Sequence, residues 1–127
     1  MVLHCRMARR CWLACISLLA FLPGCSLVGC DDNAVAGIVA IVRDAQTGTG
    51  LARSASVVAQ EAAFVDTFFN HFSDSLASGV FERPGTYRLD VTLAGYQTWT
   101  REGVRVRGGG CHVATRRVDA DLVRLAP

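Results

Sequence analysis

The sequence predicts an all-β fold: a small Greek-key β-sandwich of about seven strands, preceded by a signal peptide. Two observations predict the sandwich. Short apolar runs of strand length recur over residues 35–125, and glycine- and proline-containing turns separate them about every 8 to 12 residues. A third observation, an apolar segment behind a basic start, predicts the signal peptide.

The N-terminal segment is typical of an export signal. Its first ten residues carry three arginines and no acid, and an uncharged run follows from Cys11 to Leu22 before Pro23 breaks it. That run is too short to span a bilayer, which takes about 20 residues. We therefore expect a signal peptide over residues 1–24 (alternatively to 29), a lipid tether and linker over 25–34, and one sandwich domain over 35–125.

Removing the signal peptide changes the charge balance. The whole chain has 13 basic residues, all arginine, and 11 acidic residues. Three of the arginines lie in the signal peptide, so ten remain against eleven acids. The basicity belongs to the export signal, and we expect no nucleic-acid partner.

Two cysteines end motifs that resemble the lipobox of bacterial lipoproteins, in which a leucine, two small residues and a cysteine mark the cleavage site. The cysteine sulfur then receives a lipid. Leu22–Cys25 reads Leu-Pro-Gly-Cys and Leu27–Cys30 reads Leu-Val-Gly-Cys, and the second is the better match because Pro23 is unusual at its position. The alternative is ordinary signal-peptidase cleavage without a lipid.

Cysteine arithmetic favours the first motif. If Cys30 carries the lipid, Cys111 is a lone thiol in an oxidising compartment, which is disfavoured. If Cys25 carries it, Cys30 and Cys111 are free to pair and close a loop of about 80 residues, worth about 4 kcal/mol. We expect lipid attachment at Cys25, with Cys30 as the alternative, and a Cys30–Cys111 disulfide only if Cys30 is not lipidated.

The first strands follow from composition. Val35–Val42 is rich in valine, isoleucine and alanine, and a turn cluster containing Gly48 and Gly50 ends it. A second short apolar run spans Ala55–Ala59, and a third, Gly79–Glu82, leads into an Arg-Pro-Gly turn.

The segment 62–72 is ambiguous, because its apolar residues fall at helical spacing. We prefer a strand around Phe64–Thr67 followed by a loop, with a helical turn as the alternative. Core packing is the favoured role of these aromatic residues. A partner surface formed by Phe64, Phe68 and Phe72 is the other interpretation.

The clearest strand carries Tyr87, Leu89, Val91 and Leu93 at period two, as a half-buried antiparallel strand requires. Its dry face is expected to meet a second sheet. The remaining strands are expected over 96–100 and 104–107, around Glu102-Gly103, and over 112–125, where Val118, Ala120 and Leu122 share one face.

Three motifs resemble a known family. They are the Asp-x-x-Thr-Gly turn at Asp44–Gly48, the Gly-x-Tyr at Gly85–Tyr87 and Gly95-Tyr96. Together with the first strand they are similar to the carboxypeptidase regulatory-like domains, which have a prealbumin-like (transthyretin-like), immunoglobulin-like β-sandwich. Gly110–Val113 also looks like a cysteine-bearing segment of bacterial envelope members. The resemblance covers about residues 35–125 and implies an extracytoplasmic module without catalytic activity.

No catalytic or metal site is expected, and no cofactor. A zinc site needs three or four ligands, and the adjacent Cys111 and His112 point to opposite faces of a strand, which leaves His71 without metal-type partners. Ser73–Ser75 is better explained as a polar loop. Transthyretin-like hydrolases of purine breakdown end in Tyr-Arg-Gly-Ser, which Leu122–Pro127 does not match.

Three arginines, Arg101, Arg105 and Arg107, share one face if Arg101 continues into the strand. They suit lipid headgroups or acidic glycans. The favoured interpretation is a solvated face balanced by Glu102, Asp119 and Asp121.

The leading expectation is therefore a non-catalytic exported module of the bacterial cell envelope, facing the periplasm or the surface. A lipid would hold it to a membrane, and it would act in binding or structure on an unidentified protein or glycan. The alternatives are a small periplasmic transthyretin-like hydrolase using His71 or His112, and an assembly subunit using the Phe64–Phe72 surface.

Overall fold

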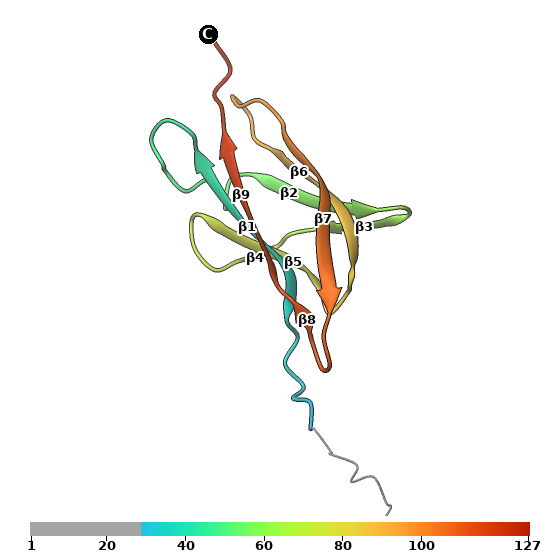
Figure 1. Cartoon of the computed structure of the whole chain (residues 1–127). Coiled ribbons are helices and arrows are strands. Elements are labelled where there is room, and N and C mark those ends of the chain that lie inside the picture. Colours follow the sequence, from blue (N-terminus) through green and yellow to red (C-terminus); the bar gives the residue numbers. More distant parts are fainter. Residues whose placement is uncertain (1–28) are drawn as a thin grey trace, which may run out of the picture.

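The computed structural model describes residues 29–127, and over that range the chain forms two packed β-sheets and no helix (Figure 1). The expected β-sandwich is confirmed. The signal peptide and Cys25 lie outside the described residues. The strands are β1 (Ala36–Asp44), β2 (Ser56–Glu61), β3 (Phe64–Thr67), β4 (Asn70–His71), β5 (Leu76–Phe81), β6 (Gly85–Thr92), β7 (Trp99–Gly108), β8 (Val113–Ala114) and β9 (Arg116–Leu122).

The two sheets have the strand orders β4-β5-β1-β9 and β3-β2-β6-β7-β8. All pairings between strands are antiparallel except one: β1 runs parallel to β9, with Ile38 opposite Arg116 and Asp44 opposite Leu122. A parallel pair cannot be closed by a hairpin and needs a long connection, and here strands β2 to β8 supply it. The starts of β1 and β9 consequently lie at the same end of the molecule.

The core lies between the sheets and is filled by alternate side chains. On β6, Tyr87, Leu89 and Val91 are each at most 1% exposed, as the period-two pattern predicts. They face an interior that includes Ile38 and Val42 of β1. On β9 the expected inward residues are also buried: Val118, Ala120 and Leu122. The dry face of β6 therefore packs against the other sheet, as expected.

Strand β7 corrects one expectation. The two strands expected on either side of Glu102-Gly103 are one strand, because a β-bulge absorbs the interruption. Tyr87 pairs with Val104 and Leu89 with Arg101, so Arg88 alone lies opposite the two residues between them. Gly103 has a φ of 68°, which glycine adopts without steric cost.

The C-terminal segment also differs from expectation, since the long strand expected over 112–125 is divided. β8 pairs with β7 in one sheet, and β9 pairs with β1 in the other. Thr115 lies between them, and its hydroxyl donates to the Ala36 carbonyl at 2.8 Å. The chain changes sheets at this residue.

The segment 62–72 is a strand, as preferred, followed by the short β4. The favoured core role fits Phe68, which is 3% exposed and belongs to the core, so Phe64, Phe68 and Phe72 do not form one exposed surface. The ring of Phe68 fills the space beside Gly79, where a Cβ would lie 2.3 Å from it. Phe64 is half-buried against the core, and only Phe72 of the three is exposed.

Candidate functional site

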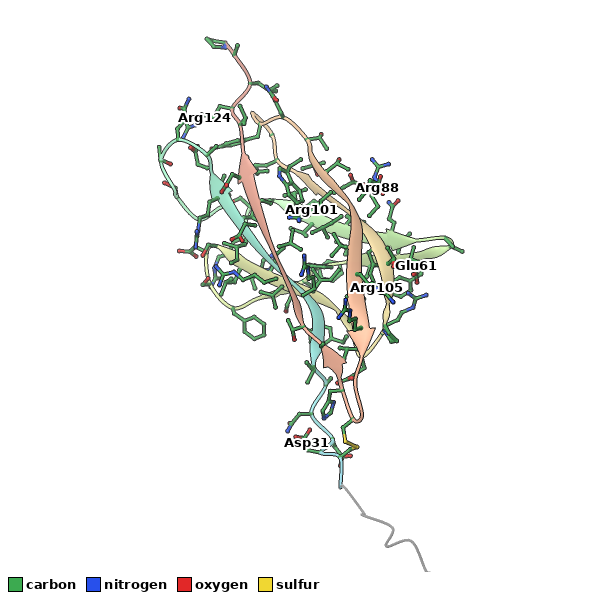
Figure 2. The ribbon with its side chains drawn as sticks, in the orientation of Figure 1. Asp31, Glu61, Arg88, Arg101, Arg105 and Arg124 are labelled. Atoms are coloured by element: carbon green, nitrogen blue, oxygen red, sulfur yellow. A yellow bond between two sulfur atoms is a disulfide. The ribbon has the colours of Figure 1, made fainter. Side chains whose placement is uncertain are left out.

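The parallel β1–β9 pair brings two cysteines together. Cys30 precedes the start of β1 by six residues and Cys111 precedes the start of β9 by five, so both segments leave the sandwich at one end. They form a disulfide with a Cα–Cα distance of 5.3 Å (Figure 2). The expected pairing is confirmed. A Cys30 sulfur in a disulfide cannot also carry a thioether-linked lipid.

Beside the disulfide, His112 lies between two carboxylates. Its Nδ1 is 2.7 Å from Glu82 Oε1 and its Nε2 is 3.0 Å from Asp31 Oδ1. The hydrogen bond with Glu82, followed by the negative charges of both partners, raises the pKa of His112. The cluster joins the segment after Cys30 to the segment after Cys111. It therefore reinforces the connection that the disulfide makes between these two segments.

Glu82 organises this cluster, and the sequence analysis gave it no role. Its carboxylate accepts the backbone N–H of Val35 at 2.7 Å and that of Val113 at 3.3 Å. The Val35 N–H is the main reason that the pKa of Glu82 is lowered. Glu82 has a φ of 50°, uncommon for a residue with a side chain, and no local sequence signal predicts it.

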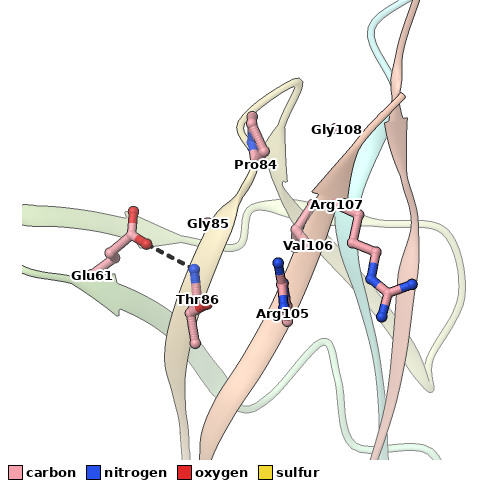
Figure 3. Close-up of a pocket in the computed structure, with 8 residues that line it drawn as sticks. All are labelled: Glu61, Pro84, Gly85, Thr86, Arg105, Val106, Arg107 and Gly108. Atoms are coloured by element: carbon pink, nitrogen blue, oxygen red, sulfur yellow. Dashed lines mark hydrogen bonds between the residues drawn. The ribbon is translucent and has the colours of Figure 1, made fainter. Parts of the chain in front are cut away.

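The outer face of the second sheet contains a shallow pocket of about 580 Å³. It is lined by Glu61, Pro84, Gly85, Thr86, Arg105, Val106, Arg107 and Gly108 (Figure 3). The Glu61 carboxylate is already engaged: it accepts the Thr86 N–H at 2.7 Å and pairs with Arg83. Within residues 29–127, neither Arg105 nor Arg107 forms an ion pair.

The three expected stripe arginines do not share a face. Arg101 lies opposite the buried Leu89, so its side chain leaves β7 on the inner side of the sheet. Arg105 alternates with the buried Val104 and Val106 and is on the outer side. The bulge produces this switch, because it adds one residue between Arg101 and Val104.

The acids expected to balance these arginines are engaged or placed elsewhere. Glu102 lies in the bulge and pairs with Arg88, at 3.6 Å. The other two acids, Asp119 and Asp121, lie on β9 in the other sheet.

A buried carboxylate lies at the opposite end of the sandwich. Asp44 is 1% exposed and accepts the backbone N–H groups of Gln46 and Thr47, both at 2.9 Å, the Tyr96 hydroxyl at 2.8 Å and Arg124 Nε at 2.7 Å. The Thr47 N–H contributes most to holding the pKa of Asp44 well below its usual range. Two of the family-like motifs, the Asp44 turn and Gly95-Tyr96, thus meet in one structural contact.

The remaining expected positions are scattered. His71 is on the short edge strand β4, and its Nε2 is buried without a hydrogen-bond partner. In the part of the chain that the structure describes, no group of three or more histidine, cysteine or acidic residues is arranged to hold a metal ion. In the same residues there is no helix long and apolar enough to cross a membrane.

No family model matches the sequence, and no curated protein matches it significantly. The likeness to the carboxypeptidase regulatory-like domains therefore depends on the first strand and the three motifs alone.

Proposed function

We propose that this chain is a non-catalytic, exported β-sandwich module of the bacterial cell envelope, anchored to a membrane by a lipid on Cys25. It resembles the carboxypeptidase regulatory-like domains and acts in binding or structure. The Cys30–Cys111 disulfide carries the proposal. Disulfides persist in oxidising compartments, and this one occupies Cys30 and leaves Cys25 as the cysteine of a lipobox-like motif.

The ionisable clusters support a non-catalytic role. Both ring nitrogens of His112 are engaged by carboxylates, which leaves neither nitrogen to act as a base toward a hydroxyl or thiol. Asp44 and Glu61 have their oxygens occupied by turn amides and by arginines. These groups connect segments of the fold, and of the three only Glu61 lines the pocket, where its carboxylate is already engaged.

Metabolic labelling with a radioactive fatty acid tests the anchor. We expect the native protein to incorporate the label, Cys25→Ala to abolish incorporation and Cys30→Ala to retain it. Cys15→Ala, within the signal peptide, is the matched control and should also retain label. Loss of label in Cys30→Ala with retention in Cys25→Ala would place the lipid on the wrong cysteine for this proposal.

Exposed aromatic residues favour a second candidate, an assembly subunit. Phe69 is 81% and Phe72 is 71% exposed, and both flank the short edge strand β4. Sedimentation velocity over a range of concentrations tests it: self-association that disappears in Phe69→Asp/Phe72→Asp supports this role. A native protein that remains monomeric at every concentration excludes assembly with itself.

A further inference from the structure

Arg105 and Arg107 are two exposed cations on one face of β7 that the fold does not use. Both are exposed and alternate with the buried Val104 and Val106. The one acid among the residues that line their pocket, Glu61, already forms an ion pair with Arg83 and accepts the Thr86 N–H. The pocket therefore has an unbalanced positive charge and an open side.

Apart from Glu61, no acid is among the residues that line the pocket. Asp31 and Glu82 are engaged by His112, between the segments that precede β1 and β8. Asp32 is exposed in the linker before β1. The pocket arginines consequently face solvent without a carboxylate to accept them.

The pocket is also close to the anchor along the covalent structure. Three glycines separate Arg107 from Cys111, and Arg107 pairs with Ala114 across the turn that holds this cysteine. Cys111 is bonded to Cys30, and Cys25 is only five residues before Cys30, a reach of at most about 18 Å. A lipid on Cys25 would hold this end of the sandwich near the headgroups, and the C-terminus is at the opposite end (Figure 1).

From this placement we propose that Arg105 and Arg107 form a binding site for the phosphate groups of anionic lipids in the membrane that holds the anchor. Each guanidinium group can donate two parallel hydrogen bonds to the oxygens of a phosphate group. Two arginines at an open pocket therefore suit a phosphate ligand. The site would fix the orientation of the sandwich relative to the membrane surface. The inference builds on the proposed anchor and adds a second, electrostatic contact to it.

The test uses a chain that starts at Ser26 and is exported on an ordinary cleavable signal peptide, so that it forms the disulfide but carries no lipid. Residues 29–127 contain the whole core and both sheets, so this chain keeps the fold. Co-sedimentation at low ionic strength compares vesicles of phosphatidylcholine alone with vesicles that also contain phosphatidylglycerol. We expect binding only to the anionic vesicles and weakening by added sodium chloride.

Arg105→Gln/Arg107→Gln should weaken binding to the anionic vesicles about 25-fold, because each arginine contributes about fivefold. The control is Arg43→Gln, which removes one exposed arginine at the other end of β1 and should leave binding within about twofold. Equal losses in the control and the double variant, or equal binding to both vesicle types, would overturn the proposal. Retention of inorganic phosphate in equilibrium dialysis by a protein that binds neither type of vesicle would also overturn it, in favour of a soluble anion. Because this chain has no lipid, these outcomes are independent of the Cys25 anchor.

Discussion

At the scale of single residues, Asp44 shows why a turn motif requires an aspartate. Two turn amides and two side chains from distant segments donate to one buried carboxylate. The aspartate and the tyrosine were recognisable as motif residues, because Asp44 begins a turn that ends at Gly48 and Tyr96 directly follows Gly95. Their contact was not predictable, because 52 residues separate them and only the sheet pairing brings them together.

Replacing this carboxylate should weaken the fold. In Asp44→Asn the amide group presents donors to the Tyr96 hydroxyl and to Arg124, so we expect a melting temperature lower by about 5 to 10 °C. The folded pKa of Asp44 is depressed, so its contribution is complete above about pH 4, the unfolded value, and is lost as the pH falls below it. Thermal melts between about pH 7 and pH 3 should show the two proteins converging in acid. Asp121→Asn, at an exposed position, should match the native protein throughout.

His112 should give the opposite pH dependence. Glu82 and Asp31 raise its pKa, so its contribution is complete below about pH 6.5, the unfolded value, and is lost as the pH rises through the folded value. The melting temperature of the native protein should fall by a few degrees between about pH 5.5 and about pH 8.5, and that of His112→Gln should fall less. An equal fall in both proteins would show that this histidine does not stabilise the closure.

At the scale of elements, the alternation of apolar and polar residues predicted which face of a strand is buried. It did not predict how the strands pair. The apolar residues of β6 and β9 identified the buried sides of these strands. Side chains alternate between the two faces of a strand, so only one orientation buries all the apolar residues. The bulge in β7 was not predicted, because Glu102-Gly103 also suits a turn between two strands. That single inserted residue decides which arginines reach the outer face, so the basic stripe was assigned wrongly.

The bulge makes a specific stability prediction. Gly103 has a φ of 68° and nothing within 4 Å of an added Cβ, so Gly103→Ala should cost about 1 to 2 kcal/mol through backbone strain alone. Gly110→Ala is the control, because it also meets no atom within 4 Å and its φ is not positive, and it should be nearly neutral. Urea denaturation measures both. A neutral Gly103→Ala would mean that β7 has no left-handed residue at this position.

At the scale of the whole molecule, the parallel pairing of the first and last long strands, β1 and β9, brings the two cysteine-bearing segments to one end. It places the segment that precedes β1 beside the Cys111 turn, and the disulfide joins two segments 81 residues apart. Cysteine counting predicted the pairing, since it was the way to avoid a lone thiol. The ion pairs of His112 with Glu82 and Asp31 were not predicted from the sequence. Both acids are distant from His112 in the sequence, and each lies in a different segment of the chain.

Closing so long a loop should stabilise the sandwich substantially. Cys30→Ala/Cys111→Ala is expected to lower the free energy of unfolding by about 4 kcal/mol, because the unfolded chain regains the entropy of the open loop. Urea denaturation of the native protein with reductant should give the same loss. A midpoint that reductant does not change would mean that the two cysteines are not bonded in the native protein.

The most direct test of the account is the intact mass of the mature protein from membranes, measured with and without reductant before alkylation. The account predicts a chain that begins at Cys25 and carries the lipid mass there, takes up no alkyl group without reductant and takes up two after reduction. A chain that begins at a lipid-bearing Cys30, with Cys111 alkylated before reduction, would contradict it.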